Sequence, residues 1–514
     1  GINPMNQSAK RLIEVDLPIR AISEHARKDQ NVRKGHLHNV HVWWATRPLA
    51  SCRAVILATL LPDPADPSCP KAFRAEAQRV LQPSTGRSLA DPLILREKLL
   101  EFIADFAAWD AGVNPRYVSM ARKLVAAAHV DGPPLVLDPF AGAGSIPFEA
   151  LRIGARSFAG DLNPVAVLIN KVSQEYLPKY GERLQAAIRT WGDWLLTQVR
   201  QKLAAYYPPD GQQRIPFAHI WARTIRCEGP DCGAVVPLLG MLTLSRKRGQ
   251  RAALRYKADR KNRRIDIELF TPSSDGDVQP AIVKRFSATC PVCTYTTPYK
   301  QVRDQIRARD GASRDARLLA VGFVDSAGQR TWRPAEKADL DLAARADRDL
   351  GHFRNQTVGG FSWVPDEPFP TWYSGVFNPG LWGITTWGDL FAPRQALALA
   401  TMAQLVASVH ERLSREGQDG PFAAAVATCL ALAVSKTAIY NTSNCYLHPD
   451  FGLKAAYLGT GMAMVPDFAE MNPLIPKYVG GLEYSIQNVM AFIERESVIE
   501  RAVGDVQQGS ATRL

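Results

Sequence analysis

The chain has 514 residues, of which 46% are hydrophobic and 22% are charged. This composition excludes a largely disordered chain, and the length suggests about three domains. The sequence has no run of about 18 consecutive apolar residues, so we expect no transmembrane helix. Eight cysteines are too few for a disulfide scaffold. We therefore expect a protein of the reducing cytoplasm.

The net charge of +12 is unevenly distributed along the chain. Residues 246–264 hold ten lysines and arginines but only one acid, Asp259, so this basic stripe alone carries +9. Concentrated positive charge attracts a polyanion and gives a salt-dependent affinity. The basic stripe, from Arg246 to Arg264, therefore predicts contact with nucleic acid, whereas a solvated and flexible basic loop is the alternative.

The N-terminal part of the chain is predicted to be helical. Residues 11–30 have an amphipathic pattern, and the apolar run at 49–61 predicts a buried helix that Pro62 and Pro64 end. Residues 65–90 are rich in proline, serine, aspartate and charge, which predicts a loop. A second helical stretch covers residues 91–128, with one break near Gly112.

Residues 133–172 alternate between a strand, a glycine turn, a helix, a second strand and a second helix, which predicts a βαβ unit and a parallel sheet. The glycine turn, residues 138–144, directly follows the first strand. Its small residues let the backbone approach a ligand, and the next helix points its amides at that ligand. Asp161 ends the second strand, where an acid accepts hydrogen bonds from ribose hydroxyls.

The turn disfavours two common nucleotide ligands. A dinucleotide fingerprint needs glycine or alanine where this chain has Pro147, and the Gly-Lys-Ser/Thr end of a P-loop is absent. The sequence DPFAGAG instead resembles the cofactor motif of S-adenosylmethionine-dependent methyltransferases that act on adenine N6 or cytosine N4 of DNA. The alternative is a βαβ turn that binds nothing. The cofactor-binding residues that this resemblance implies are Asp138, Pro139, Phe140, Ala141, Gly142, Gly144, Asp161, Leu162 and Asn163.

Two cysteine pairs predict a structural zinc site. Cys227 and Cys232 form a C-x4-C pair, Cys290 and Cys293 form a C-x2-C pair, and 57 residues separate the pairs. Two short cysteine turns can present four thiolates as a tetrahedron, which suits structural Zn²⁺. The alternative is four free or disulfide-bonded cysteines. Because the basic stripe lies between the two pairs, the same insertion is expected to contact DNA.

An aromatic and polar segment, HLHNVHVWWATRP at residues 36–48, precedes the glycine turn. In many methyltransferases the segment before such a turn folds over the cofactor. This similarity makes His41, Trp44 and Arg47 candidates for lining the cofactor pocket or the base pocket. Equally, Trp43 and Trp44 could anchor a hydrophobic core, and Arg47 could pair with an acid.

The resemblance extends over most of the chain. Residues 11–64 resemble an N-terminal domain of unknown function, DUF1156, that begins a family of large adenine-specific DNA methylases with a zinc ribbon. TTWGDLFAPRQALAL at 385–399 and DFAEMNP at 467–473 also resemble this family. The implied fold is an α/β, Rossmann-like methyltransferase core with a zinc-ribbon insertion and a helical N-terminal domain.

The resemblance implies four regions along the chain. Residues 5–90 form the DUF1156-like domain and residues 91–210 the first part of the core with the cofactor motif. Residues 211–345 form the zinc-ribbon insertion, and residues 346–514 form a helical region that returns to the core.

The sequence offers no catalytic residue. An adenine-N6 or cytosine-N4 methylase uses an Asp/Asn/Ser-Pro-Pro-Tyr/Phe/Trp loop, and neither Pro133-Pro134 nor Pro208-Pro209 fits this pattern. In the family this loop follows a segment similar to QGSA at residues 508–511, so we expect the chain to stop just before it. The resemblance implies a methyltransferase of DNA adenine, with cytosine left open, in a protein related to anti-phage defence and its partner proteins. A non-catalytic subunit that binds S-adenosylmethionine and DNA, or an RNA methyltransferase, are the alternatives.

Overall fold

The computed structural model describes residues 9–81, 88–370, 378–450, 452–458 and 461–513. The chain divides into two compact units. Unit 1 comprises residues 1–190, 413–432 and 487–514, and unit 2 comprises residues 191–412 and 433–486. The dividing points fall within four helices, which are α9 (Leu177–Leu203), α12 (Pro393–Arg415), α13 (Gly420–Ile439) and α14 (Leu482–Glu496).

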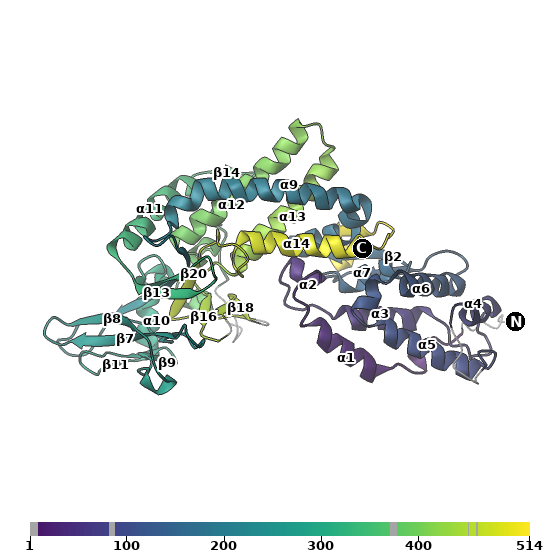
Figure 1. Cartoon of the computed structure of the whole chain (residues 1–514), viewed down its shortest axis with the longest axis horizontal. Helices are drawn as coiled ribbons and strands as arrows, with labels where there is room; N and C mark the ends of the chain where they lie inside the picture. Colours follow the sequence, from purple (N-terminus) through teal and green to yellow (C-terminus); the bar gives the residue numbers. More distant parts are fainter. Residues whose placement is uncertain (1–8, 82–87, 371–377, 451, 459–460, 514) are drawn as a thin grey trace. The chain divides into compact units, whose positions relative to one another are not determined.

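Unit 1 begins with a helical segment (Figure 1). Two of its helices start in the same way, because Asp91 and Asn114 each accept a hydrogen bond from the amide two residues later and a proline occupies the first helical position. The helices predicted at 49–61 and 91–128 are confirmed. The segment contains α1 (Ile19–Asp29), α2 (Leu37–Val40), α3 (Leu49–Leu60), α4 (Lys71–Val80), α5 (Pro92–Phe106) and α6 (Pro115–Ala128).

Two helix boundaries differ from the prediction. The helix predicted from residue 11 begins only at Ile19, after a short 3-10 turn at Leu12–Glu14. The loop predicted over residues 65–90 is wrong for residues 71–80, which form α4, and residues 82–87 of that prediction lie outside the described residues. Phe73 and Ala77 are four positions apart on one face of α4 and are fully buried. Their burial stabilises the helix despite its otherwise charged sequence.

The predicted βαβ alternation is confirmed. It consists of β1 (Leu135–Asp138), α7 (Ser145–Arg152), β2 (Arg156–Asp161) and α8 (Pro164–Asn170). Strand β2 pairs in parallel with β1 on one side and with β21 (Asp505–Gln508) on the other. The three strands therefore end at one edge. Helix α14 ends at Glu496, and β21 follows it.

A single hydrophobic core joins the N-terminal helices to the βαβ unit. Helix α3 packs against α1, α5, α6 and α7. The core includes Leu57 of α3, Leu99 of α5, Leu124 of α6 and Ala150 of α7, all fully buried. The helix that follows the glycine turn is therefore supported directly by the N-terminal segment.

Unit 2 is organised around an antiparallel sheet with the strand order β13-β12-β3-β20. In β3, every residue after Ile215 is buried, which is consistent with a central strand covered on both faces. The strands are β3 (Ile215–Ala222), β12 (Arg317–Val324), β13 (Arg330–Pro334) and β20 (Asp467–Met471).

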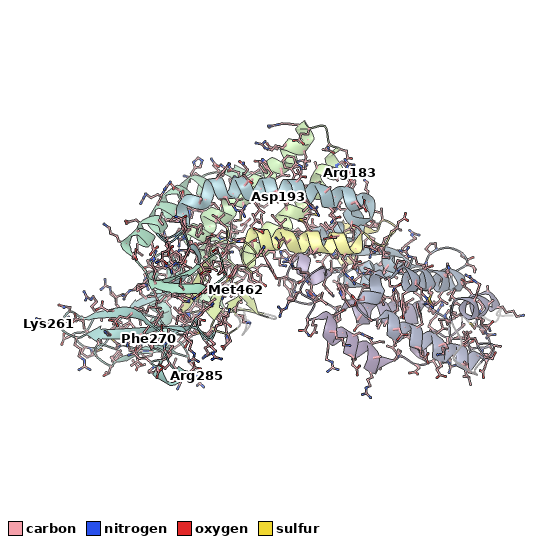
Figure 2. The ribbon with its side chains drawn as sticks, viewed as in Figure 1. Arg183, Asp193, Lys261, Phe270, Arg285 and Met462 are labelled. Atoms are coloured by element: carbon pink, nitrogen blue, oxygen red, sulfur yellow. The ribbon has the colours of Figure 1, made fainter. Side chains whose placement is uncertain are left out.

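Residues 212–345 contain many short strands joined by turns, several of them basic. A three-stranded sheet contains β6 (Thr243–Ser245), β7 (Ala252–Asp259) and β8 (Arg264–Phe270), and Lys261 lies at the end of the β7–β8 hairpin (Figure 2). The cysteines are carried by smaller ribbons. These ribbons are formed by β4 (Thr224–Arg226), β5 (Val235–Pro237), β9 (Val283–Lys284), β10 (Ser287–Thr289) and β11 (Thr296–Thr297).

The rest of unit 2 contains helices and small hairpins. These elements are α10 (Tyr299–Arg307), α11 (Lys337–Arg354), β14 (Thr357–Val358), β15 (Phe361–Ser362), β16 (Tyr446–His448), β17 (Gly452–Lys454), β18 (Tyr457–Leu458) and β19 (Gly461–Met462). Among the described residues, α13 is the one helix that is long and apolar enough to cross a membrane. More than half of its apolar stretch is buried, as is usual for a core helix of a soluble protein.

Candidate functional site

The glycine turn requires glycine at two positions. Gly142 and Gly144 have φ angles of +52° and +82°, a region that other residues rarely adopt. A Cβ atom at Gly142 would lie 2.7 Å from Nε1 of Trp43, and one at Gly144 would lie 2.2 Å from Oδ1 of Asn170. The turn is therefore closely packed on two sides.

The carboxylate of Asp161 connects the turn to the start of α8. Its Oδ2 accepts a hydrogen bond of 2.8 Å from the amide of Gly142, and its Oδ1 accepts one of 2.8 Å from the amide of Asn163. Asn163 in turn caps α8 by accepting from the amide of Val165 at 2.9 Å. Each carboxylate oxygen retains a lone pair, so Asp161 can still accept a hydrogen bond from a ligand hydroxyl.

A chain of hydrogen bonds between buried side chains supports the turn. Nδ2 of Asn170 donates to the carbonyl oxygen of Gly142 at 2.9 Å, and Gln174 donates to Oδ1 of Asn170. Oγ of Ser157 in β2 donates to Oε1 of Gln174 at 3.1 Å. Asn170 and Gln174 were not predicted from the sequence to be site residues. The available signal was their polar character within an otherwise apolar helical pattern.

Apolar side chains are exposed at the same edge of the sheet. Phe140 follows β1 and is 78% exposed, while Leu162 follows β2 and is 72% exposed. Nearby, burial and the charge of Asp161 raise the pKa of Asp138, although the amide of Phe140 donates a hydrogen bond to Asp138. The edge thus combines two carboxyl groups, a narrow turn and two apolar surfaces, which suits a ligand with hydroxyl groups and an apolar part.

The N-terminal segment reaches this turn through Trp43. The indole of Trp43 lies against Gly142, and Trp44 stacks on it with a centroid distance of 4.5 Å. Trp44 is 59% exposed. The predicted candidate Trp44 therefore covers Trp43 on its outer side, and Trp43 is the residue that contacts the turn. His41 is buried, with Nδ1 2.8 Å from the carbonyl oxygen of Val42.

Arg47 lies beside the helix that follows the turn. Its carbonyl oxygen accepts a hydrogen bond of 2.9 Å from Oγ of Ser145, the first residue of α7. Its side chain lines a cavity of about 320 Å³ whose walls include Val55, Val136 and Ile146. The structure therefore places Arg47 at an apolar cavity beside the start of α7.

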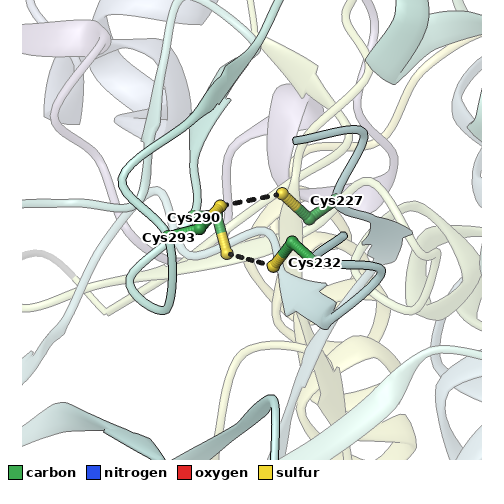
Figure 3. A group of neighbouring side chains, drawn as sticks. All are labelled: Cys227, Cys232, Cys290 and Cys293. Atoms are coloured by element: carbon green, nitrogen blue, oxygen red, sulfur yellow. Dashed lines mark hydrogen bonds between the residues drawn. The ribbon is translucent and has the colours of Figure 1, made fainter. Parts of the chain in front are cut away.

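The four predicted cysteines come together in unit 2 (Figure 3). Their sulfur atoms lie within 4.8 Å of one another. Sγ of Cys227 is 3.5 Å from Sγ of Cys293, and Sγ of Cys232 is 3.9 Å from Sγ of Cys290. Four thiolates at about 2.3 Å from one ion would be about 3.8 Å apart in a tetrahedron. The cysteine cluster could therefore hold a metal ion.

Tight turns shape the two cysteine pairs. The amide of Gly229 lies 3.4 Å from Sγ of Cys227. A Cβ atom at Gly229 would lie 3.0 Å from Sγ of Cys293, so glycine lets the two turns approach each other. Burial raises the pKa values of Cys227 and Cys290, whereas hydrogen bonds lower the pKa of Cys293 despite partial burial.

The basic stripe is partly neutralised by acids. Arg255 and Lys257 both pair with Glu268, at 3.2 and 2.6 Å. The other stripe residues with an ion pair are Arg246, Arg251 and Arg264. Within the described part of the chain, no ion pair is seen for Arg260, Lys261 and Arg263, which are exposed in the turn between β7 and β8. Lys247 and Arg248, which follow β6, are likewise exposed and have no ion pair among the described residues, so the positive charge available to a partner lies at the hairpin tip and directly after β6.

Comparison with protein families gives one match. Residues 16–81 match the model of the family described as a protein of unknown function, DUF1156. This segment is similar to DUF1156 and is called the DUF1156 domain from here on. The domain carries α1, α2, α3 and α4 and therefore includes Trp43 and Arg47, which lie at the glycine turn and at the start of α7. The expected DUF1156 relationship is confirmed for these residues. The chain matches no curated protein and no solved structure.

Proposed function

We propose that the chain binds S-adenosylmethionine and acts in a DNA methyltransferase that modifies adenine N6. The observation that carries the proposal is the carboxylate of Asp161, which is held beside Gly142 at the edge where Phe140 and Leu162 are exposed. Ribose hydroxyls can donate to such a carboxylate, and exposed apolar side chains can cover the adenine and methionine parts.

The residues at the edge fit this cofactor in charge as well as in shape. The cofactor carries a positive sulfonium, which supplies the methyl group when it is bound. Asp138 and Asp161 provide negative charge at the ends of β1 and β2, and Gly142 and Gly144 permit the left-handed backbone of the turn. The proposed Rossmann-like methyltransferase core rests on these residues and on the parallel order β1-β2-β21.

We propose that the cysteine cluster holds Zn²⁺ as a zinc ribbon. The ligand set is four sulfur atoms, and the distances between them agree with those expected for tetrahedral zinc. A closed set of four thiolates leaves no open coordination position, so the metal would be structural. It would fix the ribbons that accompany the basic hairpin.

The basic hairpin is the proposed DNA contact. Replacing Arg260, Lys261 and Arg263 together with glutamine tests it, with the Arg255→Gln/Lys257→Gln variant as a control that also loses positive charge. Each phosphate contact adds about 0.9 to the slope of log affinity against log salt. We expect the tip variant to reduce the slope by about 2–3 and the control to reduce it less, because Glu268 already neutralises its residues. Equal effects would contradict a contact at the tip.

Methyl transfer is tested with radiolabelled S-adenosylmethionine and two acceptors, duplex DNA and structured RNA. The proposal predicts label in DNA, and nucleoside analysis would identify N6-methyladenine or N4-methylcytosine. Label in RNA alone would favour an RNA methyltransferase.

A second candidate function is a binding subunit without chemistry of its own. The observation that favours it is that the 514 residues contain no Asp/Asn/Ser-Pro-Pro-Tyr/Phe/Trp sequence. This candidate predicts that the chain binds both S-adenosylmethionine and DNA but transfers no label. The same methyl-transfer experiment therefore separates the two functions.

A further inference from the structure

Unit 2 contains a cavity of about 220 Å³ that is distinct from the cysteine cluster and from the glycine turn. Its walls are mainly apolar and come from β3, β6, β16 and β20. They include Ile220, Leu244, Leu447 and Phe468. Ile220, Leu244 and Phe468 are at most 5% exposed, so these walls belong to the packed interior.

The volume of the cavity limits its occupant. A dry apolar cavity of about 150 Å³ is enough to bind benzene. A volume of about 220 Å³ is therefore enough for a ring system somewhat larger than benzene, such as a fused bicycle.

One carboxyl group lines this apolar cavity. Oδ1 of Asp467 accepts a hydrogen bond of 3.0 Å from the amide of Gly240. A Cβ atom at Gly240 would lie 2.9 Å from the same oxygen, so glycine permits this contact. Burial raises the pKa of Asp467 to about 7, although the amides of Gly240 and Met241 and the charge of Arg223 lower it. Near neutral pH the carboxyl group can therefore donate or accept a hydrogen bond.

The cavity lies next to the basic stripe. Thr243 and Leu244 in its wall belong to β6, and Arg246, Lys247 and Arg248 follow within four residues of Leu244. Arg246 is anchored by Asp450 at 2.7 Å, two residues after the end of β16, which supplies Tyr446 and Leu447 to the wall. A polyanionic strand bound to this part of the stripe would bring its bases close to the cavity.

We propose that this cavity binds one planar heteroaromatic ring of the nucleobase class, with the ring faces against the apolar walls and the ring edge hydrogen-bonded to Asp467. A nucleobase edge places donors beside acceptors, which a carboxyl group between its two protonation states can match. The choice of a nucleobase as the ring rests on the proposed function in nucleic-acid modification. The inference that the cavity binds a planar ring does not depend on that function.

The proposal is tested on the full chain by ligand-observed NMR with two probes of similar shape. 9-Methyladenine offers hydrogen bonds at its edge, and 1-methylindole does not. The wild type should bind 9-methyladenine at least fivefold more tightly than 1-methylindole. Leu244→Phe, which fills the cavity, should lose both probes, and Asp467→Val should lose the preference for 9-methyladenine.

One control variant and two further measurements make the test decisive. Asp315→Asn serves as a control, because Asp315 is an exposed acid of unit 2 that pairs with Arg309 outside the cavity. Metal content at the cysteine cluster checks that each variant keeps unit 2 folded. Binding of S-adenosylmethionine is measured in the same samples and should not change, so failure of the ring site and failure of the cofactor site are distinguishable. Unchanged probe binding in a folded Leu244→Phe variant, or a preference of the wild type for 1-methylindole, would overturn the proposal.

A single-stranded oligonucleotide that contains one 2-aminopurine identifies the source of the ring. A change in 2-aminopurine fluorescence with the wild type, but not with Leu244→Phe, would identify a base within a strand. If only the free methylated bases bind, the occupant is a free nucleobase. Both results support the ring site, and binding of neither form would overturn it.

Discussion

The guanidinium of Arg53 forms a bidentate ion pair with the carboxylate of Glu149. Nε of Arg53 lies 2.7 Å from Oε2 of Glu149, and Nη2 lies 3.2 Å from Oε1. Arg53 belongs to α3 of the DUF1156 domain, and Glu149 belongs to α7, the helix that follows the glycine turn. Both side chains are at most 1% exposed. The DUF1156 domain is thus part of the structure that supports the proposed cofactor site.

This ion pair is the start of a buried charge network. Arg152 donates to Glu149 at 2.8 Å and lies 3.0 Å from Glu496 of α14. Arg501 pairs with the same Glu496. The network connects α3, α7 and α14 within unit 1, so a change at one member is expected to affect the whole unit.

Removing one partner should destabilise unit 1 strongly. We expect Arg53→Met to lower its free energy of unfolding by about 3–5 kcal/mol, because Glu149 would remain charged and buried with one partner fewer. Arg20→Met is the matched control, since the side chain of Arg20 is 96% exposed and its partner is Glu24. Chemical denaturation followed by circular dichroism measures both variants. Equal stability of the two variants would refute the importance of the network.

The same network predicts how stability depends on pH. Burial would raise the pKa of Glu149, but Arg152 and Arg53 outweigh it and lower the pKa to about 2. In the unfolded chain the pKa is about 4.5. The stabilisation, about 3 kcal/mol, is therefore complete above pH 4.5 and is lost as the pH falls from 4.5 to 2. Urea unfolding across this range should show a steeper loss for the wild type than for Glu149→Gln. Parallel curves would contradict the ion-pair assignment.

Loss of one cysteine should release the metal. The wild-type chain is expected to contain one zinc ion, measured by elemental mass spectrometry, and Cys290→Ser should contain less than half of that amount. Cys69→Ser is the control, because Cys69 is buried in unit 1 and lies outside the cysteine cluster. The same zinc content in both variants would exclude the cluster as the metal site.

A methyl group at the glycine turn should impair cofactor binding. In Gly144→Ala the new Cβ atom would meet Oδ1 of Asn170 at 2.2 Å, in addition to a backbone cost of about 1–2 kcal/mol at positive φ. Gly132→Ala is the control, because Gly132 also has a positive φ but no atom within 4 Å of the new Cβ position. We expect at least tenfold weaker binding of S-adenosylmethionine for Gly144→Ala only. Similar losses in both variants would indicate a general effect of backbone strain.

Local patterns predicted the βαβ unit and the cysteine cluster well. The strand, the glycine turn and Asp161 follow one another within a short segment. Their contacts are with residues close by in the sequence, so the local pattern was enough to predict them. The short spacing within each cysteine pair likewise predicted that the four cysteines form one cluster. Helix α4 was missed because its composition resembles a loop, and only the burial of Phe73 and Ala77 reveals its apolar face.

Contacts between distant residues could not be predicted from the sequence. Arg53 and Glu149 are 96 residues apart, and neither belongs to a recognisable motif. The contact of Trp43 with Gly142 depends on how the DUF1156 domain packs beside the turn, so the sequence pointed to Trp44 and did not single out Trp43. The neutralisation of Arg255 and Lys257 depends on the register of β7 with β8, which places Glu268 opposite Arg255. The net charge of the stripe therefore overstated how many of its residues have no acidic partner.

The most direct test of the account is calorimetric titration of the chain with S-adenosylmethionine. Asp161→Ala is the decisive variant, and Asp505→Ala is the control, because Asp505 is an exposed acid on β21 of the same sheet. Circular dichroism checks that both variants are folded. We predict one bound cofactor per chain, at least tenfold weaker binding for Asp161→Ala and unchanged binding for Asp505→Ala. Absence of binding to the wild type, or unchanged affinity in a folded Asp161→Ala variant, would contradict the proposed cofactor site.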